Sequence, residues 1–517
     1  MKSNRGYDYI IIGAGAAGCV IANRLVENLA CRVLLLEAGS PDNREAIHNT
    51  DIPSMTSMWG PHDVNWGYMT PEQRYLNGRA IPIAQGRVLG GSTSINAMMY
   101  IRGNRRNFDH WQQLGNEGWG YNDVLPYFKK SEDYEGGASS YRGVGGALSV
   151  INYRNPSPVS QAFVQAAMEL GFAGDGWDCN GEQQENGAFF YQSTRTKDNK
   201  RCSTAVAFLA PVLHHPNLTI TTNAMATRIL MEGTKAVGVE YMKDGQLHQV
   251  KAESEVIISA GAFASPKLLM LSGIGPAEHL KQHGINVVAD LRGVGQNLQD
   301  HMLFGVGYQS LKELPFPNLL SEAGIFTYTG DDALAARDRA PDIQFFFGPV
   351  QFVDDRYKVE GPAFTFAPIL VQPESLGTVT LKSNNPVELP IVDPHYLENE
   401  VDVDVMVRGI EMAREFVNTR AFAEFRGREL APGKEVVDRE SLVNYVRNSA
   451  STVWHPVGTC KMGQDKDAVV NSRLQVHGIK GLRVADASIM PKITTGNTNA
   501  ATIMIGEKAA DLIIAAI

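Results

Sequence analysis

The chain has 517 residues, 44% hydrophobic and 20% charged, with a formal net charge of −9 at pH 7. This balance is typical of a globular enzyme, and the acidic excess argues against a nucleic-acid-binding protein, which normally carries a basic face. No apolar run of about 18 residues occurs, so we expect no membrane span, and the apolar run near the N-terminus is too short for a secretory signal.

The cysteines are scattered along the chain and form no CxxC pair. They are Cys19, Cys31, Cys179, Cys202 and Cys460. An odd number of separated cysteines is typical of reduced thiols, so we predict a cytoplasmic protein. Nothing in the sequence fixes the oligomeric state.

The first predicted elements are a strand, a glycine turn and a helix. Residues 7–12 form an apolar, β-rich run, and residues 16–28 have helical periodicity. The turn between them has the pattern GxGxxG, formed by Gly13, Gly15 and Gly18. A second strand follows, with the sequence RVLLLEAG, and ends at Glu37.

This combination predicts a dinucleotide site. The first glycine makes the tight turn, the second lets the backbone approach a pyrophosphate, and the third lets the helix pack on the strand. The helix start offers N–H groups to phosphate, and the Glu37 carboxylate can accept hydrogen bonds from a ribose diol. The motif alone does not separate FAD from NAD, but its place near the N-terminus and the Ala-Gly after Glu37 favour FAD.

A second glycine cluster, GRVLGGSTSINAMMYIRG, spans residues 86–103. Gly90 and Gly91, followed by Ser92, make a small-residue turn that another molecule can approach closely. The Asn96 amide can hydrogen-bond the edge of a heteroaromatic ring. From the residues alone, a cofactor contact and a plain turn into a helix both remain open.

At this point the sequence resembles the glucose–methanol–choline (GMC) family of flavin oxidoreductases. The family signature Gly-Arg-x-Leu-Gly-Gly-Ser-Ser/Thr-x-hydrophobic-Asn is matched from Gly86 to Asn96. Three further stretches are similar to family motifs, and the resemblance covers essentially the whole chain. They are GAFASPKLLMLSGIG (261–275), VGQNLQDH (294–301) and LRVADASIMPKITTGNTNAATIMIGEKAADLI (482–513).

The resemblance implies an α/β fold, in the form of an α+β composite. A Rossmann-like FAD-binding domain is expected from residues 1–155, 206–303 and 453–517, and a substrate-binding domain from residues 156–205 and 304–452. The second domain should hold an antiparallel sheet with flanking helices. Strand-like runs that fit this sheet occur at 342–350, 363–372 and 377–383.

His455 lies in the stretch TVWHPVGTCKMG, residues 452–463. It can be a catalytic base, a metal ligand with Cys460, or an ordinary core histidine. Oxidation of an alcohol requires a base, because the hydroxyl is as weak an acid as water, and a neutral imidazole suits this role. A metal site needs three or four ligands, and no HxxxH or HExxH pair occurs, so we predict no metal. The His-Pro-x-Gly loop resembles the one on which the family carries its base.

The resemblance places a second active-site residue in TGNTNAATIMIGE, and we assign it to Asn499, which would orient the substrate hydroxyl. Asn499 can instead be the N-cap of the final helix. Similarly, Asp486 can contact the flavin or serve as a structural turn carboxylate.

The cofactor contacts implied by the glycine motif and the resemblance form a larger set. They are Gly13, Ala14, Gly15, Ala16, Ala17, Gly18, Glu37, Ala38, Arg87, Gly90, Gly91, Ser92, Asn96, Ala97, Met98, Ala226, Asp486, Ala487, Asn497 and Thr498. Some relatives attach FAD through a histidine where this chain has Ile95, so FAD should be noncovalent. Ala97 replaces a polar residue of choline-oxidising relatives, which disfavours choline, although an aromatic cage elsewhere can still bind a cation.

We therefore predict FAD-dependent oxidation of an alcohol to an aldehyde, with electrons passed to dioxygen or to a quinone-type acceptor. The alternative is a redox-silent or light-driven enzyme of the same fold, of the hydroxynitrile lyase or fatty-acid photodecarboxylase type. Aromatic residues between positions 352 and 366 favour an apolar or aromatic alcohol, unless they belong to the sheet core and a lid loop. They are Phe352, Tyr357, Phe364 and Phe366.

Overall fold

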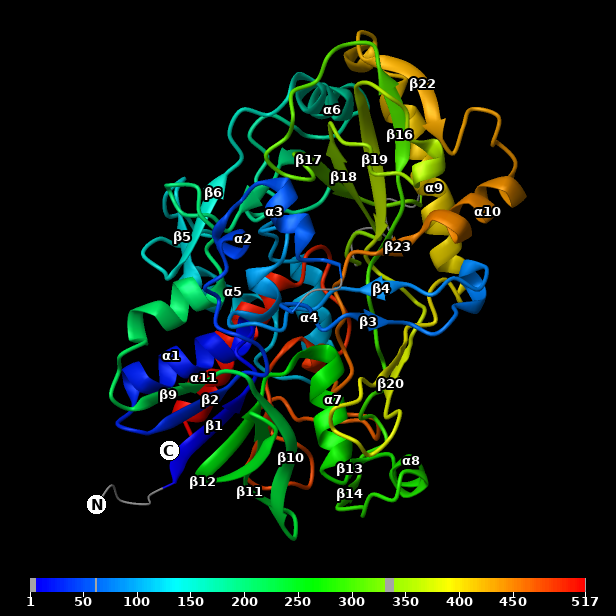
Figure 1. Cartoon of the computed structure of the whole chain (residues 1–517). Helices are drawn as coiled ribbons and strands as arrows, with labels where there is room; N and C mark the ends of the chain where they lie inside the picture. The colour runs from blue at the N-terminus through cyan, green and yellow to red at the C-terminus, as the bar shows by residue number, and fades with distance from the viewer. Residues whose placement is uncertain (1–5, 61–62, 331–338, 517) are drawn as a thin grey trace.

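The computed structural model describes residues 6–60, 63–330 and 339–516, so the outer domain limits expected at residues 1 and 517 lie outside it. The chain folds around two sheets, which lie toward opposite ends of the molecule (Figure 1). The mixture of helices with a mainly parallel sheet and an antiparallel sheet confirms the predicted α/β composite.

The first sheet has the strand order β10-β11-β12-β1-β2-β9, with β24 beside β12. Its strands are β1 (Tyr7–Ile12), β2 (Val33–Leu36), β9 (Leu218–Thr221), β10 (Ala224–Glu232), β11 (Lys235–Lys243), β12 (Gln246–Ile258) and β24 (Leu482–Val484). The strands β9, β2, β1, β12 and β24 pair in parallel, whereas β10, β11 and the first half of β12 form an antiparallel meander. The long β12 therefore joins the two kinds of pairing.

Two helices from opposite ends of the chain pack together beside this sheet. They are α1 (Ala16–Asn28) and α11 (Asn499–Ile514), and α11 also packs against α5 (Tyr121–Ser131). Gly506 allows the close approach, because a Cβ there would lie 2.9 Å from the backbone oxygen of Ala17. The first and last segments of the chain thus build one hydrophobic core.

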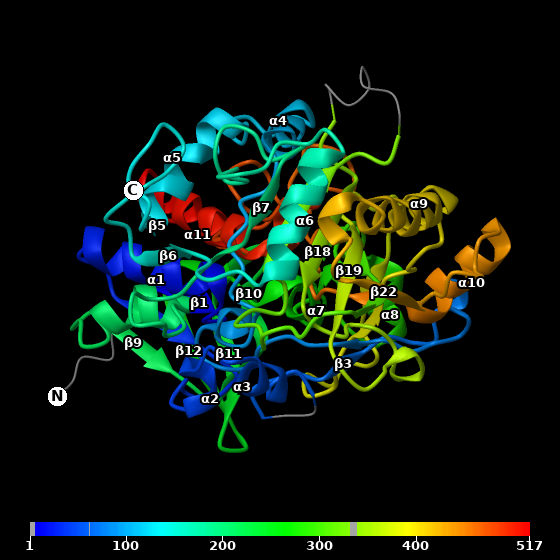
Figure 2. The ribbon, with the colours of Figure 1, turned by 90° about the horizontal axis from the view of Figure 1, so that it is seen from above.

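The second sheet is antiparallel throughout, in the order β22-β16-β19-β18-β17-β7, with β15 between β19 and β23. Its strands are β7 (Ala188–Phe190), β15 (Met302–Leu303), β16 (Val306–Ser310), β17 (Ala323–Thr327), β18 (Ile343–Gly348), β19 (Ala363–Leu370), β22 (Arg426–Ala431) and β23 (Ser451–Thr452). Helices α6 (Pro158–Glu169) and α9 (Glu400–Val417) pack over it (Figure 2). Stacked phenylalanines fill the interface, with Phe163 lying between Phe347 and Phe416.

The strand-like runs at 342–350 and 363–372 correspond to β18 and β19. The run at 377–383 does not join that sheet. It contains β20 (Thr378–Thr380), which pairs with β21 (Ile391–Asp393) and packs on α7 (Gly261–Leu271) of the first part. The reason is that Val379 bonds the backbone of Gly295 and lies in an apolar cluster with Phe263. Conversely, Met302 and Leu303 already belong to the second sheet, just before the expected crossing at 304.

Shorter elements make up the connections. They are α2 (Glu45–His48), α3 (Ile52–Ser57), β3 (Tyr68–Met69), β4 (Pro82–Ile83), α4 (Arg105–Gln113), β5 (Glu132–Tyr134), β6 (Leu148–Asn152), β8 (Gln192–Ser193), β13 (Ile274–Gly275), α8 (Ala277–Gln282), β14 (Ala289–Asp290) and α10 (Arg439–Ser449). Within the described ranges, no helix combines the length and the apolar character needed to cross a bilayer.

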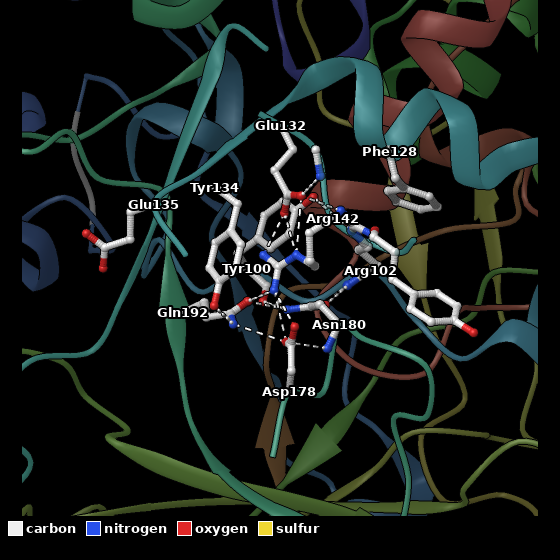
Figure 3. Close-up of polar contacts among 12 residues, drawn as sticks. Tyr100, Arg102, Phe128, Glu132, Tyr134, Glu135, Arg142, Asp178, Asn180 and Gln192 are labelled. Atoms are coloured by element: carbon white, nitrogen blue, oxygen red, sulfur yellow. Dashed lines mark hydrogen bonds and ion pairs between the residues drawn. The ribbon is translucent and has the colours of Figure 1, made fainter. Parts of the chain in front are cut away.

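A buried ion network fastens several of these connections to one another (Figure 3). Glu132 lies between two arginines, at 2.6 Å from Arg102 and 2.7 Å from Arg142. Arg142 also bonds Asp178 at 2.8 Å and lies over the ring of Tyr134. Because charges buried in this way are paired on every side, the network fixes the chain segment that follows the second glycine cluster.

Candidate active site

A cavity of about 550 Å³ reaches residues of both sheets. At one end it is lined by the glycine loop before α1, and at the other by β18, β19 and the segment after β23. The cavity therefore joins the predicted nucleotide-binding loop to His455, which lie more than 400 residues apart in the chain.

The glycine loop has the shape that a bound pyrophosphate requires. Gly13 has a φ of +99°, which a side chain rarely adopts, and a Cβ at Gly18 would lie 1.9 Å from the Gly13 oxygen. Gly15 differs, because a Cβ there would meet no described atom within 4 Å and would project into open space. Gly15 lines the cavity, so its missing side chain leaves room for a ligand at the start of α1.

Glu37 follows β2 directly and is buried. Its carboxylate accepts hydrogen bonds from the backbone N–H of Ala14 at 3.0 Å and of Gly39 at 2.8 Å. Burial raises the pKa of Glu37 to about 7, although these two hydrogen bonds lower it. A carboxylate oxygen has two lone pairs, so each oxygen retains the capacity to accept from a ribose hydroxyl.

The second glycine cluster turns toward the first. A Cβ at Gly91 would lie 2.7 Å from the Gly15 Cα, so the close approach of the two loops at this point requires glycine. Asn96 is held by Arg201, whose Nη1 bonds both the backbone oxygen and Oδ1 of Asn96 at 2.8 Å. Oδ1 also accepts from the Met98 N–H at 3.0 Å, which leaves the Asn96 amide nitrogen as the group available to a ligand.

Most of the predicted site residues line this cavity. They are Gly13, Gly15, Ala16, Ala17, Glu37, Ala38, Gly91, Ser92, Asn96, Ala97, Met98, Ala226, His455, Asp486, Ala487, Asn497, Thr498 and Asn499. Four predicted residues do not line the cavity and instead contact neighbouring residues. They are Ala14, Gly18, Arg87 and Gly90. For example, Gly90 donates its N–H to the Ala14 oxygen, and the Arg87 guanidinium lies 5.0 Å from the Trp66 ring centre.

Both carboxylate oxygens of Asp486 accept hydrogen bonds from other residues of the protein. One carboxylate oxygen accepts from the Gly261 N–H at 2.8 Å and the Ser265 hydroxyl at 2.6 Å. The other accepts from the N–H and hydroxyl of Ser488. These bonds fit the structural turn carboxylate that we weighed against a flavin contact.

The backbone around His455 is fixed by a buried carboxylate. Strand β23 pairs with β15, and His455 follows with its N–H on Asp300 Oδ1 at 2.8 Å. Asp300 also accepts from the His301 N–H and from the hydroxyls of Tyr396 and Thr452. Burial raises the pKa of Asp300 to about 6, even though its four hydrogen bonds lower it.

The His455 imidazole lies between two partners. Its Nδ1 is 3.1 Å from Nδ1 of His301, and its Nε2 is 3.2 Å from the amide nitrogen of Asn497. Burial lowers the pKa of His455 to about 3, and burial together with His455 lowers the pKa of His301 well below its usual range. Both rings are therefore neutral at pH 7, the state that a base requires.

The asparagine that contacts His455 is not the one that we assigned as the second active-site residue. Asn497, which we expected to contact the flavin, is the asparagine that contacts His455. Asn499 is the first residue of α11 and also lines the cavity, but Thr498 is the N-cap. Asn497 thus precedes α11, whereas Asn499 is its first residue.

The expected aromatic residues separate into two groups. Phe352 lines the cavity, at 45% exposure. Phe364 and Phe366 are fully buried in the core of the second sheet, and Tyr357 packs edge-on against Tyr445. The sheet-core interpretation is therefore correct for Phe364 and Phe366, whereas Tyr357 lies in the loop between β18 and β19 and is partly buried.

Cys460 takes no part in the site around His455. Its thiol is buried, and burial raises its pKa well above the usual range. Among the residues with described positions, no group of three or more His, Cys, Asp or Glu side chains is arranged to hold a metal ion.

Sequence reasoning gave no role to Asp300, His301, Trp59, Trp454 or Arg201, all of which shape the site. The motif VGQNLQDH contains the first two, and its acid-histidine end was the available signal. Trp454 precedes His455 directly and was equally visible. Arg201 carried no local signal, because its partner Asn96 is 105 residues away in the chain.

Together, the parallel sheet, the glycine loop and a neutral histidine in one cavity define a dinucleotide-dependent oxidoreductase. Residues 7–303 and 373–506 match the two family descriptions for GMC oxidoreductase. The sequence is 42% identical to an alcohol dehydrogenase (acceptor) of Pseudomonas putida, over 98% of this chain and 96% of that protein. It is 41% identical to a mitochondrial choline dehydrogenase of Mus musculus, over 98% and 89% of the two chains.

Among solved structures, the fold is similar to that of pyridoxine 4-oxidase from Mesorbium loti. The TM-score is 0.91 and the identity 32%, over 98% of each chain. The chain belongs to the GMC oxidoreductase family. It is an FAD-dependent enzyme that oxidises alcohol CH–OH groups. The open space beside Gly15, together with the Glu37 carboxylate, fits the dinucleotide.

Proposed function

We propose that His455 is the general base for alcohol oxidation and that Asn497 positions the substrate hydroxyl. The observation that carries this proposal is the contact between His455 Nε2 and the Asn497 amide at the cavity wall. Bound FAD supplies the acceptor for the hydride that leaves the carbinol carbon. The protein groups hold the alcohol and remove its proton.

The hydrogen-bond pattern supports a base-competent tautomer of His455. When the Asn497 amide nitrogen donates to His455 Nε2, that nitrogen carries a lone pair. Nδ1 of His455 then carries the proton and donates to Nδ1 of His301. His301 in turn carries its own proton on Nε2. This nitrogen is buried and makes no hydrogen bond of normal geometry to a described residue, although the Val371 backbone interacts with the ring.

Asn497 has a second polar atom for the substrate. Its Oδ1 is buried and bonds no described residue, so the side chain can hold a hydroxyl beside Nε2. An alcohol that displaces the Asn497 contact would place its O–H against the His455 lone pair. As the proton moves to Nε2, the amide stabilises the charge that develops on the oxygen.

The electrons then leave to dioxygen or to a quinone-type acceptor. Anaerobic mixing of the purified holoenzyme with a panel of primary alcohols should bleach the flavin absorbance. Peroxide formation in air, compared with reduction of a quinone dye, then identifies the acceptor.

Replacement of His455 by alanine should retain FAD and slow the anaerobic reduction by about 10²–10⁴-fold, the usual weight of general base catalysis. Unchanged reduction in this variant would contradict the role of His455.

A further inference from the structure

Arg201 is a buried arginine, 1% exposed, that holds the second glycine cluster. Its guanidinium donates to the carbonyl oxygens of Ile47 at 2.7 Å and Thr93 at 3.2 Å. It also donates to the backbone oxygen and to Oδ1 of Asn96, both at 2.8 Å. The remaining nitrogen, Nη2, is buried and bonds no described residue. Every acceptor is an uncharged oxygen, so these hydrogen bonds do not neutralise the positive charge of Arg201.

Arg195 is a second buried arginine, and its backbone forms an antiparallel β-bridge with that of Arg201. The Arg195 guanidinium donates to Oδ1 of Asn199 and to the backbone oxygens of Thr50 and Asn318, which are again uncharged. Burial, followed by the charge of Arg195, lowers the pKa of Arg201 to about 9. Both arginines therefore keep their charge at pH 7.

The two arginines differ from others in the interior of the protein. The buried Arg102 and Arg142 both pair with Glu132, whereas no described carboxylate pairs with Arg195 or Arg201. Burying a charge without a counter-charge is costly, and perturbed charges of this kind gather at functional sites. The location of the pair relative to the cavity is therefore informative.

The segment that Arg201 holds, residues 91–98, extends along the cavity and supplies much of its lining. It begins at Gly91, which lies against Gly15 of the nucleotide loop. Arg201 itself does not line the cavity, because this segment covers it. The Arg201 charge is thus separated from the cofactor cavity by a single layer of residues.

The far end of the same segment lies near His455. The Ile95 carbonyl accepts the indole N–H of Trp59 at 2.7 Å, and the Trp59 ring packs edge-on against Trp454, with the ring centres 4.7 Å apart. Trp454 directly precedes His455 in the chain. Since Arg201 bonds the residue that follows Ile95, its charge lies toward the end of the cavity that contains His455.

Alcohol oxidation places a negative charge on the cofactor in this cavity. The hydroxyl loses a proton to a base, and the carbinol carbon loses a hydride, which carries two electrons and one proton. The aldehyde leaves uncharged, so the neutral ring system that accepts the hydride becomes an anion. A buried cation nearby stabilises that anion more than the neutral oxidised ring, because charges interact strongly in a region of low dielectric.

We propose that the charge of Arg201, reinforced by that of Arg195, raises the reduction potential of the bound FAD. The potential of a bound cofactor reports how much more tightly the protein holds the reduced form than the oxidised form. Arg201 is a positioning residue here, because it acts through the Asn96 segment and through space. The proposal rests on the FAD dependence of the family and goes beyond the assignment of His455 as the base.

The test measures the midpoint potential of FAD in the holoenzyme by equilibration with redox dyes, without any alcohol. Arg201→Met removes the charge and Arg201→Lys keeps it, while both variants lose the planar fork that bonds the Asn96 segment. We expect the potential to fall by about 30 mV or more in Arg201→Met, which is a tenfold change in the equilibrium of a two-electron couple. Arg201→Lys should stay close to the wild type.

Two further variants complete the comparison. Arg195→Met leaves the bonds to the Asn96 segment intact and should lower the potential by a smaller amount. Arg154→Met removes an exposed arginine that pairs with Glu135 and is screened by solvent, so it should leave the potential unchanged. Flavin absorbance and the melting temperature show whether each variant is folded and loaded with FAD.

An unchanged potential in Arg201→Met overturns the proposal. An equal fall in Arg201→Met and Arg201→Lys also overturns it, since the hydrogen bonds would then matter and the charge would not. If the Arg201 variants lose FAD, Arg195→Met decides, and an unchanged potential there has the same meaning. A potential that follows the charge at position 201 supports the proposal even if no alcohol reduces the flavin, a result that would contradict only the proposed function.

Discussion

His301 and His455 face each other through their Nδ1 atoms at 3.1 Å, with the ring planes at 90°. Two neutral imidazoles can share one proton across such a contact, so the tautomer of each ring fixes that of the other. The pair is anchored by Asp300, which accepts the backbone N–H groups of both histidines. His301 is thus a positioning residue, because it acts on the substrate only through His455.

Replacement of His301 by alanine should slow flavin reduction, because His455 loses the acceptor that keeps the proton on its Nδ1. We expect a loss of about tenfold, the value of one hydrogen bond. His301→Gln offers a carbonyl oxygen in place of Nδ1 and should recover most of the rate. Equal rates in the alanine and glutamine variants would show that His301 has only a packing role.

The two histidines also make the fold sensitive to acid. Unfolded histidine titrates near pH 6.5, whereas the pKa is lowered to about 3 in His455 and well below the usual range in His301. As the pH falls below about 6.5, the unfolded chain binds protons that the folded one excludes, so the free energy of unfolding decreases. Asp300 and Glu37, with their pKa values raised to about 6 and about 7, take up protons in the folded state and oppose this loss.

We therefore expect acidification from pH 7 to pH 5 to lower the melting temperature of the wild type relative to that of His301→Gln, because the variant keeps only one of the two histidines with a lowered pKa. The measurement is a thermal melt of each protein at both pH values. An identical pH dependence in the wild type and the variant would contradict the assignment.

The two asparagines of the C-terminal motif offer a direct comparison. Asn497→Ala should slow flavin reduction by about 10²–10³-fold, because the amide beside His455 Nε2 is lost. Asn499→Ala removes a cavity-lining amide that does not contact His455 and should change the rate by less than about tenfold. Anaerobic stopped-flow reduction measures both, and a larger effect at Asn499 would restore the assignment made from the sequence.

The glycine loop allows cofactor binding to be separated from folding. Gly15 has φ −91°, which any residue can adopt, and its Cβ would point into open space. Gly15→Val should therefore fold with a near-normal melting temperature but bind no FAD. Gly18→Ala places a Cβ 1.9 Å from the Gly13 oxygen and should impair folding itself. Retained flavin absorbance in Gly15→Val would contradict the pyrophosphate cradle.

The buried network of Figure 3 should contribute strongly to stability. Glu132→Gln leaves Arg102 without its buried counter-charge and Arg142 with Asp178 alone, and it should lower the free energy of unfolding by about 3–5 kcal/mol. Glu135→Gln, three positions along, alters a pair with the exposed Arg154 and should cost less than about 1 kcal/mol. Urea denaturation compares the two, and equal losses would show that burial gives Glu132 no special weight.

The sequence was most informative where the signal is local. The strand, glycine turn, helix and Glu37 lie within one short stretch, and each residue type there has a backbone reason that no distant contact alters. The run at 377–383 was assigned to the wrong sheet, because alternating residues predict a strand but not its partner.

The interior of the site was harder to predict because it depends on contacts between distant residues. His301 meets His455 across 154 positions, and no pattern near either residue indicates the other. The choice between Asn497 and Asn499 depended on the residue at which α11 begins, and helix boundaries are the least certain part of a sequence-based prediction. The resemblance located the motif that holds both asparagines, whereas the contact between Asn497 and His455 required the fold.

The packing of α11 on α1 has a consequence for the order of events during synthesis. Strand β24, the His455 loop and α11 complete the cofactor sheet and its core, yet they are synthesised several hundred residues after the glycine loop. Because Asn499 and Thr502 of α11 line the same cavity as Gly15, the nucleotide cradle stays incomplete until α11 has been translated.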